Sequence, residues 1–324
     1  MQSNLGALKQ KLDDAKAVTI LSHINPDPDA LGTALGIYAL LVKDKSKKVE
    51  VVNVSKELPL YLDFLPYFKQ VKHKIDYPQS LIISCDCGSI DRLGFDLSGR
   101  EIINIDHHQS NTCYGTLNFV MPEYASSSQV AYKIFKSYCQ IHSEAATCFY
   151  TALLSDTRYF TTTSVNHEVF TTASELVQAG ADAADVAYHF TQRRSLASLR
   201  ILESALGTLE LHEDARIASI VVTRAQIEAS GATMPDLDGI VDYARSLATV
   251  QIAFCVMETD EGIRVSLRSK GLDVSKVAMA FNGGGHKVAA GFMLKQSGLQ
   301  ETIDTILQTI QTLGLINEKK IARY

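Results

Sequence analysis

Residues 18–32 read VTILSHINPDPDALG, and this stretch decides the fold. The apolar run Val18–Leu21 ends abruptly, and three side chains of the metal-ligand type follow within a few residues: His23, Asp27 and Asp29. An apolar helical pattern then begins at about Ala30. A strand that ends in such side chains and continues into a helix is typical of the carboxyl edge of an open α/β sheet, where these folds place their chemistry.

Three further runs share the short, apolar, β-branched character of Val18–Leu21 and are predicted as strands: Val49–Val54, Leu81–Ser84 and Ile102–Ile105. Helical patterns lie before, between and after these strands, over residues 1–17, 30–42, 127–139, 144–154 and 166–178. Strands that are apolar on both faces and are separated by helical or irregular segments indicate a parallel sheet. We therefore predict an α/β domain with a parallel sheet flanked by helices.

The character of the sequence changes near Arg216. Strands are predicted over residues 217–222, 250–257, 263–267 and 292–294, and helices over residues 238–247 and 274–281. The turn Asp260-Glu261-Gly262 indicates a hairpin. We expect a catalytic domain over residues 1–190, a helical linker over 191–215, and a smaller mixed α/β domain over 216–324, with a cleft between the two domains. A chain of 324 residues exceeds one typical core and fits this division.

Composition excludes several classes of protein. The formal net charge of −5 argues against a protein that follows a long polyanion, yet it allows a small phosphate in a local pocket. Charged residues in the first twenty positions argue against a secretory signal, and no apolar run approaches the ~20 residues of a membrane helix. The six cysteines have no framework spacing, which favours free thiols in a reducing cytoplasm.

Further potential metal ligands follow other predicted elements. Asp86 follows the third strand, the run Asp106-His107-His108 follows the fourth, and Asp156 closes a helix. In a parallel sheet the strand ends meet at one edge, so we expect these side chains to lie together with those of residues 23–29. Carboxylates with imidazoles suit Mn²⁺, Mg²⁺ or Zn²⁺, and the histidines among several aspartates favour Mn²⁺, with Mg²⁺ as the main alternative. The number of ligands indicates two ions, which a carboxylate can bridge.

Each residue also has a purely structural interpretation. Asp29 could cap the helix that follows it, Asp86 could cap the turn at Gly88, and Asp156 could end its helix near Thr157. A pair of neighbouring histidines is often a surface or core feature. The coincidence of four separate segments that all carry Asp or His at element ends favours the metal site.

These segments resemble the four motifs of the DHH phosphoesterase superfamily: His23-x-x-x-Asp27-x-Asp29, Asp86, Asp106-His107-His108 and Ser155-Asp156-Thr157. The run Gly283-Gly284-Gly285-His286 is similar to the glycine-rich signature of the DHH-associated domain. The resemblance spans nearly the whole chain. Within the superfamily, the length and domain order are most similar to the nanoRNase branch, whose members also dephosphorylate 3′-phosphoadenosine 5′-phosphate (pAp).

The resemblance implies a role for each ligand. Two metal ions would be bound, one by His23, Asp27 and Asp86, and the other by Asp29, Asp86, His107 and Asp156. Asp86 would bridge the ions. Asp106 would orient an imidazole, and His108 would face the substrate phosphate. Arg158 departs from the glycine that is frequent after this motif, and it either contacts substrate or points into solvent.

Substrate contacts are expected mainly from the second domain. Arg264 and Arg268 lie four residues apart on one predicted strand and therefore face the same side. The preferred substrate residues are Arg268, Ser269, Gly284, Gly285, His286 and, from the first domain, Arg158. The alternatives are a solvated strand face and, for the glycines, a flexible connector. Tyr159 and Phe160 either stack on a base or belong to the core.

The leading hypothesis is a hydrolase that degrades very short RNA and pApA-type dinucleotides and dephosphorylates pAp. The alternatives are a family II-like inorganic pyrophosphatase, a RecJ-like single-strand exonuclease, and a non-catalytic nucleotide-binding regulatory module. The expected partners are short RNA and nucleotide phosphates, without a membrane or a long duplex nucleic acid. The oligomeric state is left open between a monomer and a homodimer.

Overall fold

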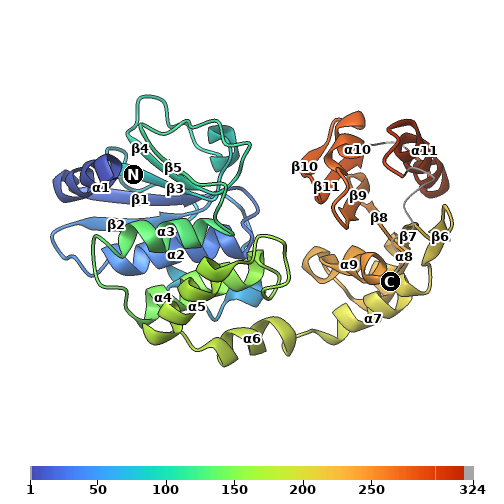
Figure 1. Cartoon of the computed structure of the whole chain (residues 1–324), viewed down its shortest axis with the longest axis horizontal. Coiled ribbons are helices and arrows are strands. Elements are labelled where there is room, and N and C mark those ends of the chain that lie inside the picture. The colour runs from blue at the N-terminus through green and yellow to red at the C-terminus, as the bar shows by residue number, and fades with distance from the viewer. Residues whose placement is uncertain (1, 296, 317–324) are drawn as a thin grey trace. The chain divides into compact units, whose positions relative to one another are not determined.

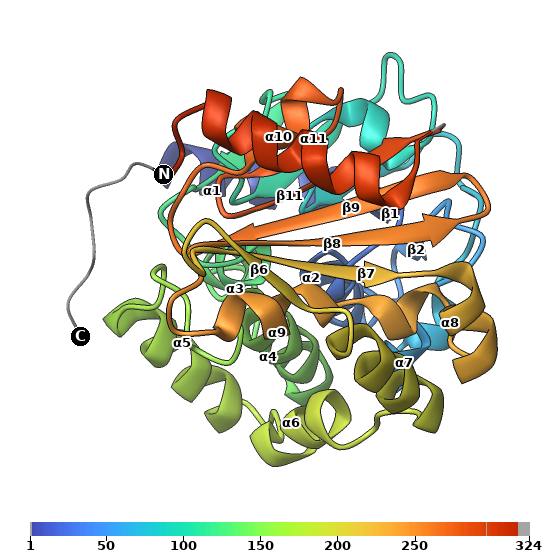
Figure 2. The same cartoon turned by 90° about the vertical axis from the view of Figure 1, so that its right-hand side faces the viewer.

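A computed structural model describes residues 2–295 and 297–316 of the chain. The chain forms two compact units, residues 1–193 and residues 194–324, which Figures 1 and 2 show from two sides. None of the helices within the described ranges combines the length and apolar character that spanning a bilayer requires.

The first unit contains a five-stranded sheet in the order β2-β1-β3-β4-β5, in which every neighbouring pair is parallel. The strands are β1 (Ala17–Ser22), β2 (Lys48–Val52), β3 (Leu81–Cys85), β4 (Ile102–Asp106) and β5 (Leu117–Val120). The predicted α/β class and parallel sheet are confirmed, and each of the four predicted strands is present. The edge strand β5 was not predicted.

Alternate residues of the inner strands contribute to two different cores, because successive side chains point to opposite faces of a sheet. On β3, Ile83 belongs to the large core beneath the helices, whereas Ile82 belongs to a smaller core with Leu93 and Leu97. The segment between β3 and β4 thus covers the second face. Both faces are buried, which explains why the strands are apolar throughout.

The helices of the first unit follow the predicted positions closely. They are α1 (Gln2–Asp14), α2 (Pro28–Leu41), α3 (Ser127–Phe135), α4 (Ser143–Asp156), α5 (His167–Gln178) and α6 (Ala183–Thr191). Short 3₁₀ turns lie at η1 (Leu60–Leu62), η2 (Phe68–Gln70) and η3 (Ile90–Leu93). In Figure 1, α2 and α3 lie against one face of the sheet, with α4 and α5 beyond them.

Helices α2 and α4 approach each other closely at two glycines. A Cβ atom on Gly32 would lie 2.7 Å from the carbonyl oxygen of Cys148, and one on Gly36 would overlap the ring of Phe149. Glycine is therefore required for this approach. The contact matters for the site because α2 begins, and α4 ends, among its ligands.

The second unit contains a six-stranded mixed sheet in the order β10-β11-β9-β8-β7-β6. Its strands are β6 (Glu210–His212), β7 (Ile217–Val222), β8 (Ile252–Thr259), β9 (Gly262–Ser269), β10 (Gly284–His286) and β11 (Ala289–Leu294). Only the β7–β8 pair is parallel, and β8 and β9 form the predicted hairpin.

Helices cover both faces of this second sheet, as Figure 2 shows, with α10 and α11 on one side and α7 and α9 on the other. The helical segments are α7 (Leu196–Leu206), α8 (Arg224–Ser230), η4 (Met234–Leu237), α9 (Ile240–Ser246), α10 (Ser275–Ala280) and α11 (Leu299–Thr312). Strands β6 and β10 and helix α11 were not predicted.

The segment that connects the two units is helical but is not one continuous helix. It consists of α6 and α7, separated by residues 192–195, where Ser195 caps α7 through its side chain. Ile201 and Ala205 of α7 are fully buried in the core of the second unit. Residues 194–215, expected as part of a linker, thus pack with the second unit.

Candidate metal centre

The predicted ligands of the first unit gather at the carboxyl edge of its sheet. His23 follows β1, Asp86 follows β3, and Asp106 is the last residue of β4, directly before His107 and His108. The start of α2 supplies Asp27 and Asp29, and the last residue of α4 is Asp156. The parallel sheet therefore brings together residues that are far apart in the sequence.

Asp86 lies between two histidines. Its Oδ2 atom is 3.7 Å from Nε2 of His23, and its Oδ1 atom is 3.7 Å from Nε2 of His107. The Oδ2 atom of Asp27 is 3.9 Å from the same nitrogen of His23. Two ligands of one divalent ion, each about 2.1 Å from it, are separated by ~3–4 Å. His23, Asp27 and Asp86 therefore fit one ion.

His107 is the centre of a second group. Its Nε2 atom lies 3.8 Å from Oδ2 of Asp29 and 3.5 Å from Oδ2 of Asp156. The ligand atoms of these three residues all lie within 4.8 Å of one another. The two oxygens of Asp86 thus face two separate groups, each with the spacing that an ion requires. The donor set of imidazole and carboxylate suits Mn²⁺ and similar ions.

Local structure fixes the acidic side chains at the start of α2. Asp27 caps the helix, because its Oδ1 atom accepts a hydrogen bond from the amide of Ala30 at 2.9 Å, which leaves Oδ2 directed at His23. Capping and a ligand role therefore use different oxygens of one residue. Asp29, for which capping was the structural alternative, is instead a buried residue of the first turn.

Asp29 and Asp86 are held by the first turn of α3. The amides of Ser127 and Ser128 donate to the two oxygens of Asp29 at 2.7 and 3.1 Å. The hydroxyl of Ser127 donates to Oδ1 of Asp86 at 2.8 Å. Amides at a helix N-terminus stabilise negative charge, so the first turn of α3 stabilises the carboxylates that it contacts.

Sequence reasoning missed Ser127. The signal available was the N-cap of α3, in which the Ser126 side chain accepts from the amide of Gln129; the Gln129 side chain accepts from the amide of Ala125, the residue before the N-cap. That pattern predicts the start of a helix. It does not show that the helix start lies against Asp29.

Asp86 also has an unusual backbone conformation. Its φ of 54° lies in the left-handed region, and its amide donates to the carbonyl of Ile105 on β4 at 3.0 Å. Aspartate tolerates this region better than most residues, but at some cost in energy. The strand thus ends in a tight turn that presents the Asp86 carboxylate at the sheet edge.

Asp106 is completely buried and does not belong to either ligand group. Its Oδ1 atom lies 2.7 Å from Nδ1 of His108 and also accepts from the amide of His107 at 2.8 Å. Asn111, which sequence reasoning did not single out, donates to the other oxygen. Asp106 therefore fixes the orientation of the His108 ring.

The carboxylates of the site repel one another in the absence of cations. Burial, and then the charge of Asp86, raises the pKa of Asp29 to about 7. Burial with the charge of Asp27 raises the pKa of Asp86 to about 6, and burial with the charge of Asp29 raises the pKa of Asp156 to about 7. Such a concentration of buried acid is stabilised by bound cations.

His108 has the opposite tendency. Burial opposes its charged form, but the hydrogen bond that its ring donates to Asp106 and the charge of Asp86 raise the pKa of its imidazole to about 9. In the absence of cations, these contacts favour the protonated form of His108. A protonated imidazole is a suitable general acid.

The chain turns sharply after Asp156. Three consecutive residues, Arg158, Tyr159 and Phe160, have φ values of 46°, 59° and 62°. The Phe160 ring packs against Phe170 at a centroid distance of 5.3 Å, in line with the core alternative. Tyr159 is 45% exposed, so the base-stacking alternative remains a prediction for this ring.

In the second unit, Arg264 and Arg268 lie on the same face of β9, as predicted. Arg268 Nε is 3.8 Å from Oδ2 of Asp242, and Arg264 Nη2 is 4.0 Å from Oδ1 of Asp238. Ser269 is buried, and its hydroxyl donates to the carbonyl of Leu272 at 2.5 Å. This hydrogen bond stabilises the turn between Ser269 and Leu272, so we do not retain the Ser269 hydroxyl as a substrate contact.

The glycine-rich run is partly regular structure. Gly284 and Gly285 lie with His286 on β10, which pairs antiparallel with β11 and is exposed to solvent. A Cβ atom on Gly285 would lie 2.5 Å from Cα of Ala290, and its φ is 141°, so a side chain is excluded there. The run is therefore a short, exposed edge strand instead of a flexible connector.

Family comparisons agree with this architecture. The model of the DHH family, N-terminal domain, matches residues 17–153, and that of the DHHA1 domain matches residues 217–313. These matches define the class of protein as a metal-dependent phosphoesterase with two domains. The chain therefore contains an N-terminal domain of the DHH family, followed by a DHHA1 domain.

Curated relatives match along most of the chain. The bifunctional oligoribonuclease and PAP phosphatase NrnA of Thermus thermophilus is 29% identical over 299 residues, which cover 91% of this chain and 89% of the relative. The protein of that name from Bacillus subtilis is 26% identical over 297 residues, covering 90% and 92%. An exopolyphosphatase-related protein from Bacteroides fragilis has a solved structure that aligns with a TM-score of 0.90, at 26% identity over 97% of this chain and 98% of that chain.

Proposed function

We propose that this protein hydrolyses very short oligoribonucleotides and pApA-type dinucleotides to mononucleotides, and that it removes the 3′-phosphate of pAp. The observation that carries the proposal is the position of Asp86, whose two oxygens each lie 3.7 Å from a different histidine. A carboxylate in this position can bridge two metal ions, the arrangement that is used for phosphate ester hydrolysis. The relatives named oligoribonuclease and PAP phosphatase support the choice of substrates.

We assign two ion sites to the ligand groups. His23, Asp27 and Asp86 would hold one ion, and Asp29, Asp86, His107 and Asp156 would hold the other. When bound, the ions would supply an activated water and would stabilise the charge that develops on the phosphoryl oxygens. Mn²⁺ is the ion we propose, because histidines are present among the carboxylates, with Mg²⁺ as the alternative.

The protein's own groups then orient the reaction. Asp106 holds the protonated ring of His108, which donates a hydrogen bond to the phosphate and a proton to the departing oxygen. Ser127 and Ser128 keep Asp29 and Asp86 in place through hydrogen bonds that need no rearrangement during reaction. No covalent intermediate on the protein is required.

We assign nucleotide recognition to the second domain. Arg268 supplies a guanidinium, and the backbone amides of Gly284 and Gly285 can approach a phosphate closely because no side chain covers them. His286 is exposed and adds a donor. For Arg158, the alternative of a substrate contact stays a prediction. We also propose a cytoplasmic location, where short RNA fragments arise, and leave the homodimer as a hypothesis.

One comparison of rates tests the proposal. Metal-loaded protein is assayed on pAp, a diadenylate, a five-nucleotide RNA and pyrophosphate side by side. We expect pAp and the dinucleotide to be hydrolysed at least about tenfold faster, as kcat/KM, than pyrophosphate. Preference for pyrophosphate would favour a pyrophosphatase, and preference for the longer RNA would favour a processive exonuclease. Release of neither phosphate nor mononucleotide would favour a regulatory module.

A further inference from the structure

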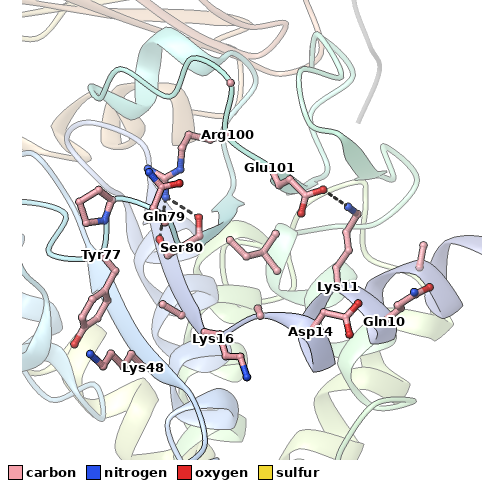
Figure 3. Close-up of a pocket in the computed structure, with 16 residues that line it drawn as sticks. Gln10, Lys11, Asp14, Lys16, Lys48, Tyr77, Gln79, Ser80, Arg100 and Glu101 are labelled. Carbon is pink, nitrogen blue, oxygen red and sulfur yellow. Dashed lines mark hydrogen bonds and ion pairs between the residues drawn. The ribbon is translucent and has the colours of Figure 1, made fainter.

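The first unit has a large pocket at the amino edge of its sheet, opposite the edge that carries the metal ligands. The pocket has a volume of about 1000 Å³ and lies where β1, β2 and β3 begin, beside the last turn of α1 (Figure 3). Ligand pockets typically have volumes of ~300–1000 Å³, so a small organic molecule fits. The proposed hydrolysis makes no use of this pocket.

Cations outnumber anions among the side chains that line the pocket. These are the cations Lys11, Lys16, Lys48 and Arg100 and the anions Asp14 and Glu101. Lys11 Nζ lies 2.7 Å from Glu101, so this pair is neutral. Among the residues that the structure describes, Lys16 and Lys48 have no carboxylate within 4.0 Å. Two ammonium groups therefore remain uncompensated in the pocket.

The two uncompensated lysines are exposed to solvent, and their backbones are adjacent. Lys48 begins β2, and its amide donates to the carbonyl of Lys16, directly before β1, at 3.0 Å. The Lys48 ammonium lies 5.6 Å from the centre of the Tyr77 ring, and Figure 3 shows it directed towards that ring. A cation–π contact of this kind positions an ammonium without neutralising its charge. The remaining charge is available to an anion.

Hydrogen bonds fix the side of the pocket that carries Tyr77. The amide of Tyr77 donates to the completely buried carboxylate of Glu50 at 3.1 Å, and the amide of Asp76 donates to the same carboxylate at 3.2 Å. Next along this side, the hydroxyl of Ser80 bonds to the hydroxyl of Thr19, and the guanidinium of Arg100 donates to the carbonyl of Ser80 at 2.6 Å. The pocket is therefore pre-formed, as ligand sites usually are.

The opposite end of the pocket has different chemistry. Figure 3 shows Asp14 and Gln10 at the end of α1, away from Tyr77 and Lys48. A carboxylate and an amide oxygen accept hydrogen bonds from hydroxyl groups. The pocket thus offers cations to one end of a ligand and acceptors to the other.

We propose that this pocket is a second ligand site, which binds the phosphate of a phosphomonoester at Lys16 and Lys48 and the hydroxyls of its sugar at Asp14 and Gln10. Nucleoside monophosphates and sugar phosphates share this chemistry. The inference holds whether or not the proposed function is correct, because it uses none of the metal ligands.

The chain contains no tryptophan, which permits a site-specific test. Tyr77→Trp places a single fluorophore in the pocket, and metal-loaded protein is titrated with AMP, ribose 5-phosphate, inorganic phosphate and adenosine. We expect a saturable change in emission with AMP and with ribose 5-phosphate. If AMP binds at least about tenfold more tightly than ribose 5-phosphate, the ligand is a nucleotide, and equal affinities indicate a sugar phosphate.

Matched variants check the assignment. Lys16→Ala with Lys48→Ala should weaken AMP binding by about tenfold or more, whereas Lys45→Ala, an exposed lysine outside the pocket, should leave it unchanged. A response to adenosine or to inorganic phosphate equal to that of AMP would overturn the proposal, as would no saturation up to ~10 mM.

A second measurement needs no fluorophore. Equilibrium dialysis of radiolabelled AMP against the unmodified, metal-loaded chain counts its binding sites. The double lysine variant should have one site fewer than the unmodified chain, and equal counts would contradict the proposal. Tyr188→Trp, an exposed ring that does not line the pocket, is the control for non-specific fluorescence changes.

Discussion

The Nδ1 atom of His108 lies 2.7 Å from Oδ1 of Asp106, a carboxylate that is completely buried and belongs to none of the candidate metal-binding groups. The imidazole is thereby fixed in one orientation. The carboxylate also stabilises the proton on the ring, in part accounting for a pKa of about 9. His108 also lies 3.5 Å from Asp86, so substitution of Asp106 tests whether the pair acts through the proton on His108 or through metal binding.

Asp106→Asn should lower kcat by about 10–100-fold with little change in KM or in bound metal, because the amide cannot stabilise the charged ring. The alkaline limb of the kcat–pH profile should also move to lower pH. Steady-state kinetics between pH 6 and 10 and metal analysis check both points. If the variant loses metal in proportion to activity, Asp106 acts on the ligands and not on His108.

Asp86→Ala should abolish hydrolysis, by at least about 10³-fold, because both ion sites lose the carboxylate between them. The bound metal should fall below two ions per chain while the circular dichroism spectrum is unchanged. Asp91→Asn is the matched control, since Asp91 is an exposed carboxylate of the same loop region. Activity of Asp86→Ala within a few-fold of the unmodified protein would rule out the bridging role.

Stability of the metal-free protein should fall as the pH rises. The pKa values of Asp29 and Asp156 are raised to about 7 and that of Asp86 to about 6, from an ordinary 3.8, so between pH 4 and 7 the folded state binds more protons than the unfolded state. His108, raised from 6.5 to about 9, continues the decline up to pH 9.

Bound metal should remove this dependence, because the ions displace the protons. The stabilisation by Mn²⁺ should therefore be larger at pH 8 than at pH 5. Thermal unfolding midpoints, measured in chelator and in saturating Mn²⁺ from pH 5 to 9, give both curves. A midpoint in chelator that rises with pH over this range would contradict the charge balance described for the site.

Gly32→Ala should destabilise the first domain, although alanine favours helix. The added Cβ would lie 2.7 Å from the carbonyl oxygen of Cys148, which cannot move without displacing α4. We expect a loss of about 1–3 kcal/mol in the free energy of unfolding. Gly6→Ala, on α1 with no atom within 4 Å of the new methyl, should gain about 0.5–1 kcal/mol. Urea denaturation of both variants decides the comparison.

Part of the predicted metal site was predictable from sequence because His23 and Asp86 directly follow strands and Asp106, His107 and His108 stand at the end of another. An apolar run that ends in His23 or Asp86 indicates both the end of a strand and a ligand, and the parallel arrangement brings these ends together. The support from Ser127 was not predictable in this way. It depends on where α3 contacts Asp29, and that position is set by packing between distant helices.

Other differences have particular causes. Strand β5 has only four residues and an internal Asn118, so its pattern is weak. Strand β10 is formed by Gly284, Gly285 and His286, whose intrinsic preference for strands is low, and it exists because β11 offers a free edge. Helix α11 is different, because its apolar residues recur at helical spacing, and this pattern is sufficient to predict a helix.

The backbone at Asp86 has a consequence for how the molecule matures. Its left-handed turn is fixed by a hydrogen bond to β4, and its carboxylate is held by the first turn of α3. Nascent chain that ends before Asp156 lacks the last ligand in sequence order. If Asp156 is a ligand as we propose, both ion sites can be complete only after the chain through Asp156 has left the ribosome.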